Sequence, residues 1–284
     1  FHMQEYVMGN GAIALGALAA GVNLVAGYPG TPSSEILETI SKYRHDGVYI
    51  EWSVNEKAAM EVAAAAAYSG ARAMVTMKQV GLNVAADPLM SLAYVGVKGG
   101  MVIVSADDPG PISSQTEQDT RRFADFCRIP VFDPSSPEEA YKMIGEAFEY
   151  SEKYNTPVLF RPTTRVCHAY ASIDNCDSPS PKKYEGFVKD SKKWVIFPRL
   201  SFANHIMIEK RNVEIGKDFS TYSANKAEGV NSEKAVVTSG ISYAYTKECL
   251  KDYPDVKLIK IATAYPFPED FVLSSLEGAK EVLC

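Results

Sequence analysis

Between residues 4 and 165, short apolar segments alternate about six times with segments of helical periodicity. The apolar segments at 73–77 and 101–105 are continuously apolar and do not alternate with polar residues. A strand that is covered on both faces has this pattern, and parallel strands need a crossover helix between them. This part of the chain therefore predicts an α/β fold with a doubly wound parallel sheet.

The stretch from 51 to 81 joins two of these strands through an alanine-rich helix. Asn55 is a suitable N-cap, and Glu56 follows it in the first turn, where the helix dipole favours a carboxylate. Alanine has the highest helix propensity and a very small side chain, so such a helix can lie close to its neighbours. Glu56 should therefore lie at the carboxyl edge of the sheet, where open α/β sheets bind ligands. The alternative is an ordinary surface carboxylate that suits a helix start.

A tight loop at 27–34 connects a short strand at 23–27 to a helix at 35–43. Its prolines and glycines fix the turn, and Thr31 and Ser33 can cap the helix or accept hydrogen bonds at its start. Such a loop presents hydroxyl and backbone N–H groups at a sheet edge. A plain strand-to-helix turn is the alternative, because proline is common at the first helical position. A single helix is expected over about 80–93.

Several functional classes are disfavoured by composition. The net charge is −6 and the chain has no basic run, which argues against nucleic acid as a partner. The five cysteines and four histidines are scattered without ligand spacing, so we expect no metal site on this chain. Scattered thiols fit a reducing cytoplasm, and no apolar run is long enough to span a membrane. Gly9-Asn10-Gly11 lacks the spacing of a dinucleotide fingerprint, and no long strand is expected before Gly9.

The chain changes character after about residue 168. We expect three parts: an α/β domain over 1–168, an extended connection over 169–232 with a helix possible at 202–219, and a second α/β domain that begins at 233–284. Two strands and two helices are too few to close a core alone. The second domain is therefore expected to be truncated.

Several motifs resemble those of the 2-oxoacid:ferredoxin oxidoreductases, which are thiamine diphosphate enzymes. They are GYPGTPSS at 27–34, NEKAA at 55–59, MKQVGLN at 77–83 and DDPGPISSQTEQDTR at 107–121. Together with TSGISYAY at 238–245, they are most similar to the large (alpha) subunit of the indolepyruvate branch. The resemblance covers essentially the whole chain.

This resemblance implies a pyrimidine-binding domain followed by the start of a transketolase C-like domain. The chain would hold only the pyrimidine half of a thiamine diphosphate site. Mg²⁺ and 4Fe-4S clusters are expected on other segments, because this sequence has no Gly-Asp-Gly motif with a downstream asparagine and no cysteine cluster.

By the same resemblance, Glu56 is the carboxylate that hydrogen-bonds N1′ of the cofactor's aminopyrimidine and activates it. Glu61 and Glu51 compete for this role, but Glu61 lies on another face of the helix and Glu51 lies in the preceding strand. Thr31 would lie near the thiazolium and the substrate carbonyl. For Gln79 and Asn83, ordinary helix capping is the alternative to a place beside the ring. The implied cofactor-binding set is Tyr28, Pro29, Thr31, Glu56, Gln79, Gly81 and Asn83.

Two positions depart from the family's pattern. In pyruvate-type relatives an arginine that binds the substrate carboxylate follows Ser-Ala after the fourth strand, whereas Asp107 follows Ser105-Ala106 here. This difference favours the arylpyruvate branch. Gly11 stands where the branch often has a glutamate.

The expected function is the oxidative decarboxylation of aryl 2-oxoacids such as indolepyruvate to acyl-CoA, with ferredoxin as electron acceptor. The expected partners are a second copy of the chain, a small beta subunit, ferredoxin, the 2-oxoacid and CoA. The fragment is expected to be cytoplasmic and inactive alone. The alternatives are a subunit of a non-oxidative 2-oxoacid decarboxylase and a non-catalytic scaffold with the same fold.

Overall fold

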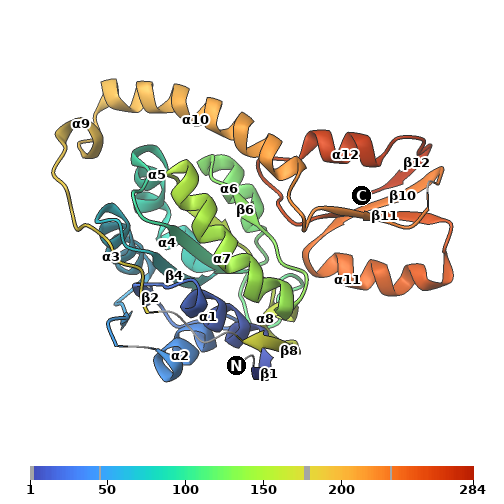
Figure 1. Cartoon of the computed structure of the whole chain (residues 1–284), viewed down its shortest axis with the longest axis horizontal. Coiled ribbons are helices and arrows are strands. Elements are labelled where there is room, and N and C mark those ends of the chain that lie inside the picture. The colour runs from blue at the N-terminus through green and yellow to red at the C-terminus, as the bar shows by residue number, and fades with distance from the viewer. Residues whose placement is uncertain (1–2, 45, 176–179, 231) are drawn as a thin grey trace.

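A computed structural model of the chain describes residues 3–44, 46–175, 180–230 and 232–284. Its centre is a six-stranded sheet in the order β3-β2-β4-β5-β7-β6, and every neighbouring pair is parallel (Figure 1). The strands are β2 (Leu24–Gly27), β3 (Tyr49–Trp52), β4 (Ala73–Lys78), β5 (Met101–Ala106), β6 (Val131–Phe132) and β7 (Val158–Phe160).

Helices cover both faces of this sheet. Successive strand residues point to opposite faces, so Val102 and Val104 join one hydrophobic cluster while Met101 and Ile103 join the other. The doubly wound parallel sheet expected from the apolar strands is confirmed. The first face is covered by α1 (Gly9–Ala19), α2 (Ser34–Tyr43) and α7 (Pro137–Tyr154), and the second by α3 (Glu56–Tyr68), α4 (Gln79–Val84), α5 (Ala86–Val95) and α6 (Thr120–Cys127).

Two local expectations are wrong. The helix expected over about 80–93 is two helices, α4 and α5, which meet at Ala85. A six-residue strand, β1 (Met3–Met8), does precede Gly9. It pairs antiparallel with β8 (Tyr170–Asn175) outside the parallel sheet, so Gly9 still does not follow a strand of a dinucleotide-binding unit.

The segment expected as an extended connection contains regular structure. Besides β8, it carries α9 (Ser191–Trp194), the long helix α10 (Pro198–Ser220) and β9 (Lys226–Glu228), while α8 (Thr164–His168) lies just before it. The helix expected at 202–219 is thus part of α10. Near the end of α10, Phe219 is fully buried and lies edge-to-face on Phe132 at 5.4 Å between ring centroids. The connection is therefore anchored in the first core.

The C-terminal part is a four-stranded sheet in the order β12-β10-β11-β9, flanked by α11 (Gly240–Cys249) and α12 (Glu269–Ser275) (Figure 1). β10 (Lys234–Ser239) is parallel to β11 (Val256–Ile261) and β12 (Glu281–Leu283), whereas β9 is antiparallel to β11. The chain after β11 also bonds edge strand β6, because the Val131 amide donates to the Tyr265 carbonyl at 2.7 Å. The two sheets are thus physically joined.

Candidate functional site

Three neighbouring strands of the main sheet end at the same edge, since β3, β2 and β4 are adjacent and parallel. The loop after β2 carries Thr31, the turn after β3 leads to Glu56, and β4 runs directly into Gln79 and Gly81 of α4. Residues that are far apart in the sequence are therefore brought to one edge of the sheet, which is the ligand-binding edge of open α/β folds.

Glu56 is the first residue of α3 and is half-buried. The Asn55 side chain accepts a hydrogen bond from the Ala58 amide at 2.9 Å, which confirms the predicted N-cap. Among the described residues, the Glu56 carboxylate has no hydrogen-bond or ion-pair partner. The buried face of α3 is made mainly of alanines, and it packs on β2 and β4 as expected for a smooth helix.

The two competing carboxylates lie in different surroundings. Glu51 accepts hydrogen bonds from the hydroxyls of Ser53 and Tyr49, both at 2.6 Å, and these bonds lower the pKa of Glu51. Glu61 is exposed on α3. Glu56 differs from the exposed Glu61 because it is half-buried. It differs from Glu51 because its oxygens are free to accept hydrogen bonds from a ligand.

Gly81 lies directly against the Glu56 side chain. A Cβ at position 81 would be 2.6 Å from both Cγ and Oε1 of Glu56. Real Cβ atoms are not found that close to other atoms, so any side chain at position 81 would require the Glu56 side chain to move away. The two residues therefore form one feature: a carboxylate held against bare backbone.

The loop that carries Thr31 is held by its own serines. The Ser33 hydroxyl donates to the Gly30 carbonyl at 2.9 Å, and the Gly30 amide donates to the Ser34 hydroxyl at 2.8 Å. Ser33 is the N-cap residue of α2 by position, but its side chain makes no capping hydrogen bond, in contrast to the expectation. Thr31 is exposed, as are Tyr28 and Pro29.

Asn10, in the first turn of α1, was missed as a site residue. It is completely buried, and its Nδ2 donates to the Pro32 carbonyl at 2.7 Å and to a Glu35 carboxylate oxygen at 2.8 Å. These bonds fix both ends of the turn that follows Thr31. In the sequence, this residue could have been noticed as an asparagine between two glycines at the start of an otherwise apolar segment.

Gln79 and Asn83 differ from one another. Gln79 is buried, its Nε2 donates to the Thr116 carbonyl at 2.6 Å, and its Oε1 accepts from the Asp108 amide at 2.5 Å. It therefore ties the end of β4 to the loop after β5. Asn83 is exposed within α4 and has no side-chain hydrogen bond to any described residue. Neither residue caps a helix, so the capping alternative is wrong for both, while their place beside a cofactor ring stays a prediction.

The Asp107 carboxylate is fully buried and accepts hydrogen bonds inside the protein. Arg161 donates from Nε to its carboxylate at 2.7 Å, and the Thr120 hydroxyl donates at 2.8 Å. Burial raises the pKa of Asp107, and the charge of Arg161 opposes that rise. Arg161 also reaches the fully buried Asp133 at 3.4 Å. This network braces β5, β6 and β7 against one another.

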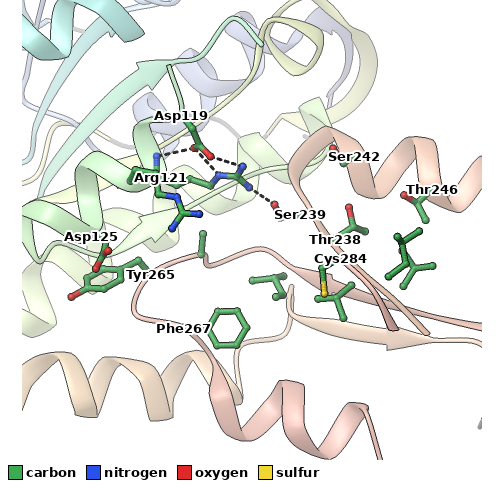
Figure 2. A pocket seen from close by; sticks show the side chains of 16 residues that line it. Asp119, Arg121, Asp125, Thr238, Ser239, Ser242, Thr246, Tyr265, Phe267 and Cys284 are labelled. Carbon is green, nitrogen blue, oxygen red and sulfur yellow. Dashed lines mark hydrogen bonds and ion pairs between the residues drawn. The ribbon is translucent and has the colours of Figure 1, made fainter. Parts of the chain in front are cut away.

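A cavity of about 900 Å³ lies between α6 and the C-terminal sheet (Figure 2). Arg121 crosses its upper side, where the guanidinium donates to Ser239 at 2.6 Å and pairs with Asp119 at 2.8 Å. None of the site residues expected from the sequence lines this cavity. It belongs to the junction between the two sheets.

No group of three or more histidine, cysteine, aspartate or glutamate side chains in the described residues could hold a metal ion. Four cysteines are free thiols, and Cys176 lies outside the described residues. In the described ranges, no helix combines the length and the apolar character that a membrane crossing requires.

The fold resembles two solved structures. The 2-oxoglutarate:ferredoxin oxidoreductase from Magnetococcus marinus matches with a TM-score of 0.79 at 18% identity, over 98% of this chain and 57% of that chain. A split-gene transketolase, an inactive β4 tetramer, matches with a TM-score of 0.58 at 12% identity, over 96% of this chain and 76% of that chain. The chain therefore shares the α/β fold of these two structures.

A family model described as "Pyruvate flavodoxin/ferredoxin oxidoreductase, thiamine diP-bdg" matches residues 15–231. The chain belongs to this family.

Among curated proteins, the indolepyruvate oxidoreductase subunit IorA of Thermococcus kodakarensis is 43% identical over 98% of this chain and 44% of its own length. The subunit of the same name from Methanothermobacter thermautotrophicus is 41% identical over 98% of this chain and 46% of its own length. The 2-oxoglutarate synthase subunit KorA of Methanocaldococcus jannaschii is 26% identical over 98% of this chain and 87% of its own length. The chain thus spans less than half the length of the two indolepyruvate oxidoreductase subunits.

Proposed function

We propose that this chain is the pyrimidine-side portion of a thiamine diphosphate-dependent oxidoreductase that decarboxylates aryl 2-oxoacids of the indolepyruvate type. The products would be acyl-CoA and CO₂, with ferredoxin as electron acceptor. The indolepyruvate oxidoreductase subunits that are 41–43% identical to the chain support the substrate class. Because the chain spans only part of those relatives, the fragment is expected to be inactive alone.

The observation that carries this proposal is the free carboxylate of Glu56 against Gly81. Thiamine diphosphate, when bound, supplies the carbanion-stabilising chemistry that 2-oxoacid decarboxylation needs. An aminopyrimidine ring is flat, and a carboxylate with open acceptor sites beside a bare glycine fits its edge. Glu56 would accept a hydrogen bond from N1′ and hold a proton on that atom. Such a charge-assisted bond is strongest where water is excluded.

Water is not fully excluded from the surroundings of Glu56 in this chain. Tyr28, Trp52, Val54 and Val84 lie on the neighbouring segments, and their exposures are 38%, 42%, 84% and 47%. A second protein surface could bury these exposed apolar side chains. We therefore propose that a second copy of the chain completes the site and excludes water from it.

The remaining assignments are part of the same proposal. Thr31 would face the substrate carbonyl from its exposed loop, Tyr28 and Pro29 would contact the cofactor, and Asn83 would border the ring. Buried Gln79 would act mainly by holding the loop after β5. A small beta subunit, ferredoxin and CoA are proposed partners, Mg²⁺ and 4Fe-4S clusters are proposed for segments outside this sequence, and the location is proposed to be cytoplasmic.

The proposed division of the chain follows the strand pairing. A pyrimidine-binding region over 1–168 would be extended by β8, which pairs with β1. The beginning of a transketolase C-like domain over 233–284 would be joined by β9, which pairs with β11. The connection over 169–232 would lie between them, with α10 as its main element.

The test uses the complete enzyme. The full-length chain is co-expressed with the small subunit, and indolepyruvate-dependent reduction of a viologen dye is measured in the presence of CoA. Glu56→Gln is expected to reduce kcat by at least about 100-fold, since it removes an interaction that acts in the chemical step. Near-full activity of Glu56→Gln would remove Glu56 from the mechanism.

Product analysis separates the alternatives. Acyl-CoA with reduced dye supports the proposal, whereas free aldehyde without dye reduction indicates a non-oxidative decarboxylase. If the wild-type complex consumes no aryl 2-oxoacid, the scaffold alternative is favoured.

A further inference from the structure

A 2-oxoacid brings a carboxylate to the active site, and a cation normally meets such a group. Two nearby cations in the sequence are already paired: Lys57, next to Glu56, is 2.8 Å from Asp87, and Arg121, in the helix after β5, is 2.8 Å from Asp119. Asp107, which follows β5, has the wrong sign and is engaged by Arg161 at 2.7 Å. A free cation at this edge is therefore a candidate for substrate binding.

Lys78 is such a cation. It is the last residue of β4 and is half-buried, and it has no carboxylate partner among the described residues. Its ammonium donates to the Ser113 carbonyl at 3.2 Å. An ammonium has three donors, so two remain for another acceptor.

The path of the Lys78 side chain places it beside the Thr31 loop. A Cβ on Gly30 would lie 3.0 Å from Cδ and 3.2 Å from Cγ of Lys78, so the aliphatic stem crosses the backbone of Gly30. The ammonium thus lies between the loop after β2 and the loop after β5. Gly81, which contacts Glu56, follows Lys78 by less than one helical turn.

We propose that Lys78 binds the carboxylate of the 2-oxoacid and thereby determines specificity for 2-oxoacids over uncharged carbonyl compounds. This inference rests on the proposed function. The carboxylate takes the free donors of the Lys78 ammonium, and the adjacent keto group is then directed toward the Thr31 loop. The aliphatic stem packed on Gly30 limits where the ammonium can move.

A purely structural role for Lys78 would be to hold the loop after β5. That loop has a second and stronger tie, because buried Gln79 donates to the Thr116 carbonyl at 2.6 Å. Asp108 also accepts from the amides of Ile112 and Ser113 at 3.0 and 2.8 Å. The loop is therefore expected to stay in place when the Lys78 ammonium is removed.

The experiment compares Lys78→Met, Lys78→Arg and Lys57→Met in the full complex. In Lys78→Met, the KM for indolepyruvate is expected to rise about 10- to 100-fold with kcat changed less than about 3-fold, because a lost ground-state contact acts on KM. Lys78→Arg should restore KM to within about 5-fold, since the charge is kept. Lys57→Met should leave KM unchanged, because that lysine is paired with Asp87.

A binding measurement gives a second readout. Titration calorimetry compares indole-3-propionate with the neutral indole-3-propionamide. The wild-type complex should prefer the acid, and Lys78→Met should lose that preference while its thermal unfolding midpoint stays unchanged. An unchanged KM, or a preference for the acid that persists in Lys78→Met, would overturn the assignment. If the wild type shows no activity with any aryl 2-oxoacid, the proposed function fails, and the acid–amide comparison still decides the role of Lys78.

Discussion

The side chain of Glu56 lies against the backbone of Gly81, at a distance that leaves no room for a Cβ on residue 81. The contact joins the first turns of α3 and α4, which follow two strands separated in the sheet by β2. The smooth alanine face of α3 lets that helix pack closely on β2 and β4, and the bare glycine lets α4 meet its first turn. Together they set the position of the carboxylate.

The first prediction concerns this contact. Gly81→Ala is expected to push the Glu56 side chain aside and to reduce kcat of the complex by about 10- to 100-fold, because catalytic groups need sub-ångström placement. The assay is viologen reduction with indolepyruvate. Gly145→Ala on α7 is the matched control, since its Cβ would meet only the Ala20 Cβ at 3.8 Å. Equal activity of the two variants would show that Glu56 tolerates displacement.

The second prediction concerns Asn10, which holds the Thr31 loop through the Pro32 carbonyl and Glu35. Asn10→Ala leaves a buried carbonyl without its donor, so a loss of about 1–3 kcal/mol in unfolding free energy is expected. The loop should also become mobile, and kcat should fall more than the KM rises. Urea unfolding and steady-state kinetics on the same preparation measure both effects. A variant with lower stability but wild-type kcat would contradict the positioning role.

The third prediction concerns the anchoring of α10. Phe219 contacts Phe132, Tyr150 and Tyr222 in one aromatic cluster, so Phe219→Ala should cost about 3–5 kcal/mol in unfolding free energy. Phe202→Ala on the same helix removes a side chain that is 73% exposed and should change stability by less than about 0.5 kcal/mol. Denaturant titrations followed by circular dichroism compare them. Similar losses in both variants would mean that α10 is not anchored as described.

The fourth prediction is a pH dependence. Burial raises the pKa of Glu152, but hydrogen bonds from Arg72 and Lys182 outweigh it and lower the pKa to about 2. The unfolded value is about 4.3, so the ionised carboxylate stabilises the fold above that pH. This stabilisation is lost as the pH falls from about 5 towards 2.

In Glu152→Gln, the unfolding free energy should be lower by about 2 kcal/mol at pH 7, and the difference should vanish near pH 2. Urea unfolding at four or five pH values measures both curves. Parallel curves for wild type and variant would show that Glu152 is not responsible for the acid sensitivity.

Local sequence patterns predicted much of the fold correctly. Continuous apolar runs specified buried parallel strands because both faces of such strands are covered by helices. Asn55 at the start of α3 was predictable because N-capping depends only on residues a few positions apart. The division of 79–95 into α4 and α5 was not predictable, since both pieces have the same apolar character and the break depends on how each packs.

The sequence by itself determined the doubly wound α/β class, the helix start at Glu56 and the family motifs, because these depend on local propensity and spacing. The tertiary structure alone decided which carboxylate is free, since Glu51 is engaged by its strand neighbours and Glu56 lies against Gly81. It also decided that Asn10 holds the Thr31 loop and that Lys78 crosses Gly30. The contacts of Glu56 with Gly81, of Asn10 with the Thr31 loop and of Lys78 with Gly30 join residues that are far apart in the sequence, and only the folded chain brings them together.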